Sequence, residues 1–166
     1  MMKTKVTVII GLLVGIIADN LYSQSRNEVR DLDIESVTEI EVDYEDSNGK
    51  EIVRFKTFYD KRGNIIKELD YDKSGKLTEI ITYEYNEDDN KIKEIHYKPN
   101  NTIIKTYTYN YEKGLLTERK EYDKNNKLVS RNTYKYEDRL RTERNEYDES
   151  KRLIEKKKYI YKFKDK

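Results

Sequence analysis

Residues 71–97 read YDKSGKLTEIITYEYNEDDNKIKEIHY, and this stretch decides the fold. Between Leu77 and Tyr85 the side chains alternate with a period of two, which is typical of a β-strand. One face of this strand would carry Leu77, Glu79, Ile81, Tyr83 and Tyr85, and the other Thr78, Ile80, Thr82 and Glu84. Turn-forming residues stand before and after it, so we predict tight hairpin connections on both sides.

The same pattern recurs along the chain. Segments that begin with Tyr and enter a turn start at Tyr59, Tyr71, Tyr85, Tyr97, Tyr111, Tyr122, Tyr136 and Tyr147. Their spacings are 12, 14, 12, 14, 11, 14 and 11 residues, so short and long units alternate and the repeat is a pair of 25–26 residues. Self-similarity at a fixed period is the signature of a repeat architecture.

Turn chemistry supports this interpretation. Residues that tolerate a positive φ stand before the next strand at Gly63, Gly75, Asn90, Asn101, Gly114 and Asn126. The carboxylates of Asp60, Asp72 and Asp123 are placed to accept hydrogen bonds from backbone N–H groups two residues on. Ser150-Lys151 departs from the pattern, and we expect a strained or looser turn there.

Alternating tyrosines end the long strands, and they are the candidate ligand-binding residues. They are Tyr83, Tyr85, Tyr107, Tyr109, Tyr134, Tyr136, Tyr159 and Tyr161. Successive repeats would stack these rings on one face of the sheet, with Thr, Lys, Glu and Arg on a solvated opposite face. Tyr suits a binding surface because it has an apolar body and a polar tip. The alternative is that the rings form the core of a thin sheet.

The expected fold class is all-β: an antiparallel meander of repeated β-hairpins that forms a long twisted or coiled sheet. We assign residues 42–166 to this Tyr-rich hairpin repeat domain and residues 24–41 to an N-terminal tether or cap. The end of the chain would be an edge strand guarded by Lys156, Lys157 and Lys158. A second copy could associate through the Tyr face or a sheet edge.

Composition excludes several classes of function. Charged residues make up 40% of the chain, yet 34 basic residues balance 33 acidic ones, which argues against nucleic acid and anionic membrane as partners. The chain has no Cys, so disulfides, thiol nucleophiles and zinc–thiolate sites are ruled out. With 16 Tyr residues and few aliphatic ones, the chain is expected to form a thin ordered sheet instead of a thick core.

Residues 1–23 are predicted to be a secretory signal peptide. Lys3 and Lys5 precede an apolar run of 12 residues, 6–17, which is too short to span a membrane. Cleavage after Ser23 is preferred to cleavage after Ala18; a buried N-terminal helix or strand and an uncleaved anchor are the alternatives. The chain is therefore expected to be exported, to the periplasm, the cell surface or the medium, without stable membrane insertion after cleavage.

Two units, residues 59–65 (YDKRGNI) and 71–77 (YDKSGKL), resemble the YD repeats of RHS-type proteins. The resemblance extends over about residues 42–163, although Asn or nothing replaces Gly in the other units. It implies an exported chain whose hairpins wind into a spiralling sheet. Large members of that family enclose a toxin, whereas about four double repeats are too few to close a shell.

No residue pattern predicts catalysis. His96 is the only histidine and is expected on a strand surface, and the acidic residues Asp46, Asp88 and Asp89 are expected to serve turns instead of calcium. We therefore expect no enzyme, no metal and no cofactor. The leading hypothesis is a non-catalytic binding or structural surface for a protein or glycan; the alternatives are a neutralising partner of a toxin and, last, an enzyme.

Overall fold

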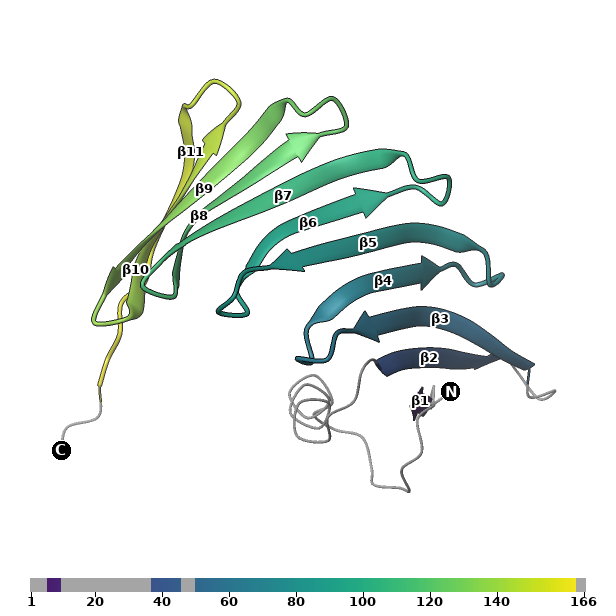
Figure 1. Ribbon diagram of the computed structural model, residues 1–166. Coiled ribbons are helices and arrows are strands. Elements are labelled where there is room, and N and C mark those ends of the chain that lie inside the picture. The colour runs from purple at the N-terminus through teal and green to yellow at the C-terminus, as the bar shows by residue number, and fades with distance from the viewer. Residues whose placement is uncertain (1–5, 10–36, 46–49, 164–166) are drawn as a thin grey trace. The chain divides into compact units, whose positions relative to one another are not determined.

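The computed structural model describes residues 6–9, 37–45 and 50–163, and in these residues every regular element is a strand (Figure 1). The strands are β1 (Val6–Ile9), β2 (Val37–Glu45), β3 (Lys50–Tyr59), β4 (Ile65–Tyr71), β5 (Leu77–Tyr85), β6 (Lys91–Tyr97), β7 (Ile103–Glu112), β8 (Leu115–Asp123), β9 (Leu128–Glu137), β10 (Leu140–Asp148) and β11 (Leu153–Lys158). They follow one another in the sheet in chain order, and the sheet is not closed. The predicted antiparallel meander of hairpins is confirmed.

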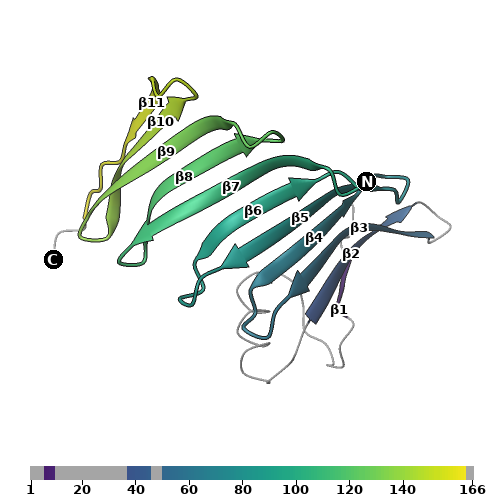
Figure 2. The ribbon, with the colours of Figure 1, turned by 45° about the horizontal axis from the view of Figure 1, so that its top comes forward.

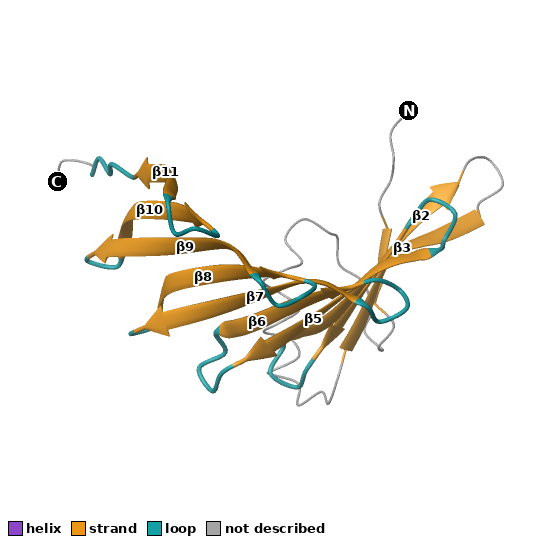
Figure 3. Cartoon of the chain, turned by 90° about the horizontal axis from the view of Figure 1, so that it is seen from above, coloured by secondary structure: helices purple, strands orange, loops and turns teal. Residues whose placement is uncertain are grey.

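Two compact units divide the chain. The first comprises Met1–Tyr83 with His96–Thr102, and the second comprises Glu84–Ile95 with Ile103–Lys166. In each unit, the strands from β3 onward alternate in direction and are joined by short turns (Figure 2). Colouring by secondary structure shows strands and loops only, among the residues that are described (Figure 3).

Most of the predicted leader and tether lies outside the described residues. Of residues 1–23, only β1 is described, and it pairs with β2 in the register Val6↔Val42 to Ile9↔Glu39. The expected cleavage site and residues 24–36 of the tether fall in the undescribed part. The signal peptide therefore stays a prediction. The sheet itself includes β2 from Val37, ahead of the predicted domain start at residue 42.

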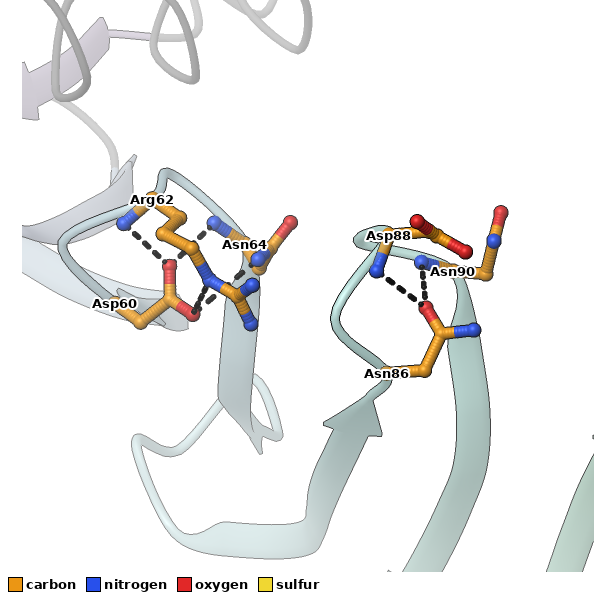
Figure 4. Close-up of polar contacts among 6 residues, drawn as sticks. All are labelled: Asp60, Arg62, Asn64, Asn86, Asp88 and Asn90. Carbon is orange, nitrogen blue, oxygen red and sulfur yellow. Dashed lines mark hydrogen bonds and ion pairs between the residues drawn. The ribbon is translucent and has the colours of Figure 1, made fainter. Parts of the chain in front are cut away.

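The longer turns share one five-residue geometry, which the Asp60 and Asn86 turns illustrate (Figure 4). The Asp60 carboxylate accepts hydrogen bonds from the backbone N–H groups of Arg62 at 2.8 Å and Asn64 at 2.9 Å. In the Asn86 turn, Asn86 Oδ1 accepts from the backbone N–H groups of Asp88 at 3.1 Å and Asn90 at 2.9 Å. The predicted role of Asp60, Asp72 and Asp123 is confirmed, and Asn86 and Asp148 share it.

One turn prediction is wrong, and one is half right. The residue with positive φ in the Asn86 turn is Asp89, at 59°, and not Asn90, because the turn begins at Asn86 and its fourth residue takes the left-handed conformation. Lys151 occupies the equivalent position with φ 63°, which is strained for a side chain that is not Gly or Asn. That turn is not looser, however, because Asp148 makes the same backbone bonds as the other turns.

The buried layer is thin. Among the described residues, the buried large apolar side chains are Ile52, Tyr59 and Tyr107. Polar side chains are buried beside them: Thr57, Asn64, His96, Asn132 and Asn145. The backbone ladder therefore holds most of this sheet together, and the side chains above it are largely half-buried. The burial of His96, which is 8% exposed, corrects the expectation that it lies on the strand surface.

Candidate binding face

In the second unit, tyrosines and arginines alternate from strand to strand on one side of the sheet. The register pairs Tyr109 of β7 with Arg119 of β8, and Tyr134 of β9 with Arg144 of β10. Directly paired residues point to the same side of a sheet. We call this side the tyrosine face. Its residues are Tyr107, Tyr109, Tyr111, Arg119, Glu121, Asn132, Tyr134, Tyr136, Arg141, Arg144 and Glu146, together with Tyr159 and Tyr161, which contact Arg141.

The expectation that Arg and Glu would be confined to the opposite face is therefore wrong. The long strands do place Tyr on one side, but the short strands between them place Arg119, Glu121, Arg144 and Glu146 on that same side. The short strands are polar on both faces. The alternation of their side chains therefore does not predict which face lies on the same side of the sheet as the tyrosine rings.

The arginines lie against the rings. The Arg119 guanidinium is 4.6 Å from the centroid of the Tyr107 ring, and the Arg141 guanidinium is 4.8 Å from that of Tyr134. Arg141 also lies 5.9 Å from the Tyr136 ring. Such contacts stabilise a guanidinium through the negative face of the ring and fix its position.

A second feature of this face recurs with the 25-residue repeat. The hydroxyl of Tyr111 donates to the Lys91 carbonyl at 3.0 Å, that of Tyr136 to the Leu116 carbonyl at 2.9 Å, and that of Tyr161 to the Arg141 carbonyl at 2.7 Å. Each bond joins the end of a long strand, or the segment after β11, to the start of the preceding short strand. These three tyrosines therefore tie neighbouring hairpins together, which is a structural role.

Tyr109 contributes a different bond. Its hydroxyl donates to Glu94 Oε2 at 2.9 Å, and its ring lies 4.9 Å from Lys91 Nζ. Burial raises the pKa of the Tyr109 phenol far above its ordinary value, and the negative charge of Glu94 raises it further. The phenol is therefore protonated at every physiological pH and acts as a hydrogen-bond donor.

The opposite face of the second unit is a set of ion pairs. Glu118 pairs with Lys120 and Arg131, both at 2.5 Å, and Glu143 pairs with Lys135 at 3.0 Å and Lys156 at 3.5 Å. Desolvation of Glu118 acts to raise its pKa, but the hydrogen bonds from Lys120 and Arg131 outweigh it, so the pKa is lowered. Each of these four basic groups thus has a carboxylate within ion-pair distance, with each carboxylate shared by two of them.

Two arginines of the tyrosine face differ from those of the opposite face. In the part of the chain that the structure describes, no carboxylate lies within ion-pair distance of Arg119 or Arg141, and the Nε atoms of both are buried without a hydrogen-bond partner. The Nε of Arg144 is likewise buried without a partner, but its guanidinium pairs with Glu146 at 3.4 Å and also with Glu155. Asn132, directly opposite Arg119, is buried and its Oδ1 has no partner.

The first unit carries a different cluster, made of carboxylates and the histidine. His96 Nδ1 lies 2.7 Å from Glu79 Oε1, and the Tyr83 hydroxyl donates to Glu68. Asp70 is paired in register with Glu79, and burial raises its pKa, with the charges of Glu79 and Glu68 adding to the effect and His96 opposing it. Tyr83 is thus engaged with an acidic residue, unlike the arginine-flanked rings of the second unit.

The eight predicted tyrosines therefore do not form a single uniform surface. Tyr83 belongs to the first unit, whereas Tyr85, Tyr107, Tyr109, Tyr134, Tyr136, Tyr159 and Tyr161 belong to the second. Within the second unit Tyr107 is buried, Tyr134 is half-buried, and Tyr159 is 36% exposed. Sequence reasoning missed Arg119, Arg141 and Arg144. The 25-residue spacing of Arg119 and Arg144 was the available signal for two of them.

Among the described residues, no group of three or more His, Asp or Glu side chains is arranged to hold a metal ion. A search of the same residues finds no helix of the length and apolarity that crossing a bilayer requires.

Comparison with known proteins yields no family. No family model matches the chain, and no curated protein matches it. Among solved structures, the chain is similar to a crystal structure of TarM, with 13% identity and a TM-score of 0.30, and to a mutant of S. aureus TarM in complex with fondaparinux, alpha-GlcNAc-glycerol and UDP, with 12% identity and a TM-score of 0.31. Each match covers 84% of this chain and spans 24% of the TarM chain.

Proposed function

We propose that this chain is an exported, non-catalytic binding module whose tyrosine face in the second unit contacts a protein or a glycan. The observation that carries the proposal is the alternation of half-exposed tyrosine rings with ring-stacked arginines across β7 to β10. Rings held by neighbouring strands lose little conformational entropy when a ligand covers them, which favours binding.

The contacts within the face separate scaffold from contact residues. The hydroxyls of Tyr111, Tyr136 and Tyr161 donate hydrogen bonds to backbone carbonyls, and Tyr107 is buried. These four tyrosines therefore stabilise the sheet. Tyr134 and Tyr159 are half-buried and partly exposed, and they flank the Arg141 guanidinium. We assign the main ligand contacts to the rings of Tyr134 and Tyr159.

The test is a binding screen against a glycan array and a pull-down from the surface fraction of the producing cells. The double variant Tyr134→Ala, Tyr159→Ala should lose the ligand that the wild type retains. Tyr147→Ala is the matched control, because Tyr147 lies on the opposite face. There the centroid of its ring is 5.6 Å from the Arg131 guanidinium. A double variant that binds as well as the wild type would remove the tyrosine face as the contact surface.

A further inference from the structure

We infer that the ligand of the tyrosine face is an acidic glycan, whose carboxylate or sulfate groups bind Arg119 and Arg141 while its sugar rings lie on the tyrosines between them. This inference rests on the proposed function and adds the chemical class of the ligand. It starts from the two arginines that have no carboxylate within ion-pair distance in the described part of the chain.

The contrast with the opposite face gives the charge argument. There, Arg131 is paired with Glu118, and Lys135 and Lys156 are paired with Glu143. A chain with 34 basic and 33 acidic residues has enough carboxylates to pair these arginines as well. The tyrosine face also carries Glu121, Glu146 and Glu155, and the last two pair with Arg144. Arg119 and Arg141, which have no carboxylate within ion-pair distance in the described part of the chain, are therefore the two points of this face that an anionic ligand would complement.

The surroundings of the two guanidiniums prepare them for such a ligand. Each has its Nε buried and its planar group held against a tyrosine ring, at 4.6 Å for Arg119 and 4.8 Å for Arg141. A guanidinium held in this way presents its outer N–H groups in the fork that matches a carboxylate or sulfate. Those of Arg141 also contact the hydroxyls of Tyr136 and Tyr159, which an anion would share or displace. Little side-chain entropy remains to be lost when the anion binds.

The arrangement favours a glycan over an acidic peptide. Tyrosine strands and arginine strands alternate, so like residues recur at every second strand, about 10 Å apart. A ligand that crosses the strands therefore contacts a tyrosine ring and then a guanidinium, in alternation. An acidic polysaccharide has matching groups, because its sugar rings can lie on the tyrosines and its acidic groups can bind the arginines. Sheets bind extended peptides at their edges, through backbone hydrogen bonds, and the tyrosine face offers no such row of backbone groups.

Titration calorimetry with three probes tests the inference: an oligogalacturonate, a galactose oligomer of the same length and linkage, and a poly-glutamate peptide of equal charge. We expect the protein to bind the oligogalacturonate, and the other two at least about tenfold more weakly. The double variant Arg119→Gln, Arg141→Gln should lose at least about tenfold in affinity for it. The double variant Arg119→Lys, Arg141→Lys should fall between, because it keeps the charge and loses the fork.

The matched control is Arg131→Gln, Arg139→Gln, which removes the same charge from the opposite face and a turn and should bind as the wild type does. Circular dichroism melts establish that each variant is folded. Equal binding of the charged and neutral oligomers, with no effect of Arg119 and Arg141, would overturn the inference and leave the proposed function standing. Preference for poly-glutamate, or no binding of any probe, would also overturn the inference. In that case the glycan-array screen with the Tyr134 and Tyr159 variants still tests the proposed function independently.

Discussion

At the scale of single residues, the side chain at the first position of most five-residue turns accepts hydrogen bonds from backbone N–H groups of the same turn. Asp123 Oδ1 accepts from the backbone N–H groups of Asn125 and Lys127, each at 2.9 Å. Asp123→Ala leaves both donors without that acceptor, and we expect it to lower the free energy of unfolding by about 1–2 kcal/mol, measured by urea denaturation. An unchanged midpoint would mean that backbone bonds suffice for this turn.

Lys98 supplies the reciprocal experiment. It stands at the same turn position, makes the same two backbone bonds, and has no side-chain acceptor to offer. Lys98→Asp should therefore raise the urea midpoint. The new carboxylate can accept from the Asn100 N–H, and from the Thr102 N–H in place of Asn100 Oδ1, which accepts from it at 3.2 Å.

Arg139 carries local strain. The two-residue turn between β9 and β10 is Asp138-Arg139, with φ values of 48° and 69°, whereas its counterpart between β7 and β8 has Gly114 at 75°. A non-glycine residue in the left-handed region costs about 1 kcal/mol or more, so Arg139→Gly should stabilise the fold by about that amount in urea denaturation. Gly114→Ala is the control of opposite sign. Its new Cβ would meet no atom within 4 Å, and only the φ of 75° penalises it. A lower midpoint for Arg139→Gly would contradict this account.

Asp70 and Glu143 should respond to pH in opposite directions. The folded-state pKa of Asp70 is raised above 3.8 by burial and by the charges of Glu79 and Glu68, so ionisation of Asp70 destabilises the fold. Asp70→Asn should be more stable than the wild type at pH 7, and the difference should vanish as the pH falls below 3.8. A less stable Asp70→Asn at pH 7 would contradict the assignment.

Glu143 is the case of opposite sign. Hydrogen bonds from Asn145 and then Lys135 lower the pKa of its carboxyl from 4.5 to about 2, so the ionised form stabilises the fold. Glu143→Gln should therefore be less stable than the wild type at neutral pH. That deficit should persist above 4.5 and disappear as the pH falls through about 2, as thermal melts across this range would show.

At the scale of strands and turns, the sequence predicts those features that leave a periodic mark. The spacing of turn residues and the period-two pattern of residues 77–85 predict the hairpins, and the structure confirms them. The faces of β8 and β10 could not be predicted, because a strand that is polar on both sides has no apolar side to orient it. Bulges also shift the register, for example between Asn110 and Tyr111, so counting by twos fails there. The stacking of Arg119 on Tyr107 depends on this pairing and needed the structure.

The hydroxyl bond that joins neighbouring hairpins gives a prediction at this scale. Tyr136 donates to the Leu116 carbonyl at 2.9 Å, across from β9 to β8. Tyr136→Phe keeps the ring and removes this bond, together with the contact of the hydroxyl with Arg141, and we expect a loss of about 1 kcal/mol in urea denaturation. Tyr134→Phe, on the same strand, removes a hydroxyl that makes no bond to a backbone carbonyl, and should cost less. Equal losses in the two variants would show that the carbonyl bond does not carry the effect.

At the scale of the whole molecule, the strands within each unit are stabilised through their sequence neighbours. The strands follow chain order in the sheet, and the same hydroxyl-to-carbonyl bond recurs at Tyr111, Tyr136 and Tyr161. In such a repeat array stability is close to a sum of repeat terms and nearest-neighbour terms. The loss of one end should therefore weaken the adjacent repeat most, and distant repeats least.

Removal of residues 148–166 tests this. The truncation deprives Arg144 of Glu155, Glu143 of Lys156 and the Arg141 carbonyl of the Tyr161 hydroxyl, so most of the contacts that are lost belong to β10. Two others are the pairing of Asp148 with Ser130 of β9 and the ion pair of Glu149 with Lys127. We expect amide hydrogen exchange to accelerate strongly in β10, less in β9 and β8, and not at all in β3 and β4. Progressive loss from that end is the behaviour of an open array, in which each hairpin depends on the next. A uniform loss of protection from β3 to β9 would instead show that the sheet folds as one cooperative body, and the nearest-neighbour account would fail.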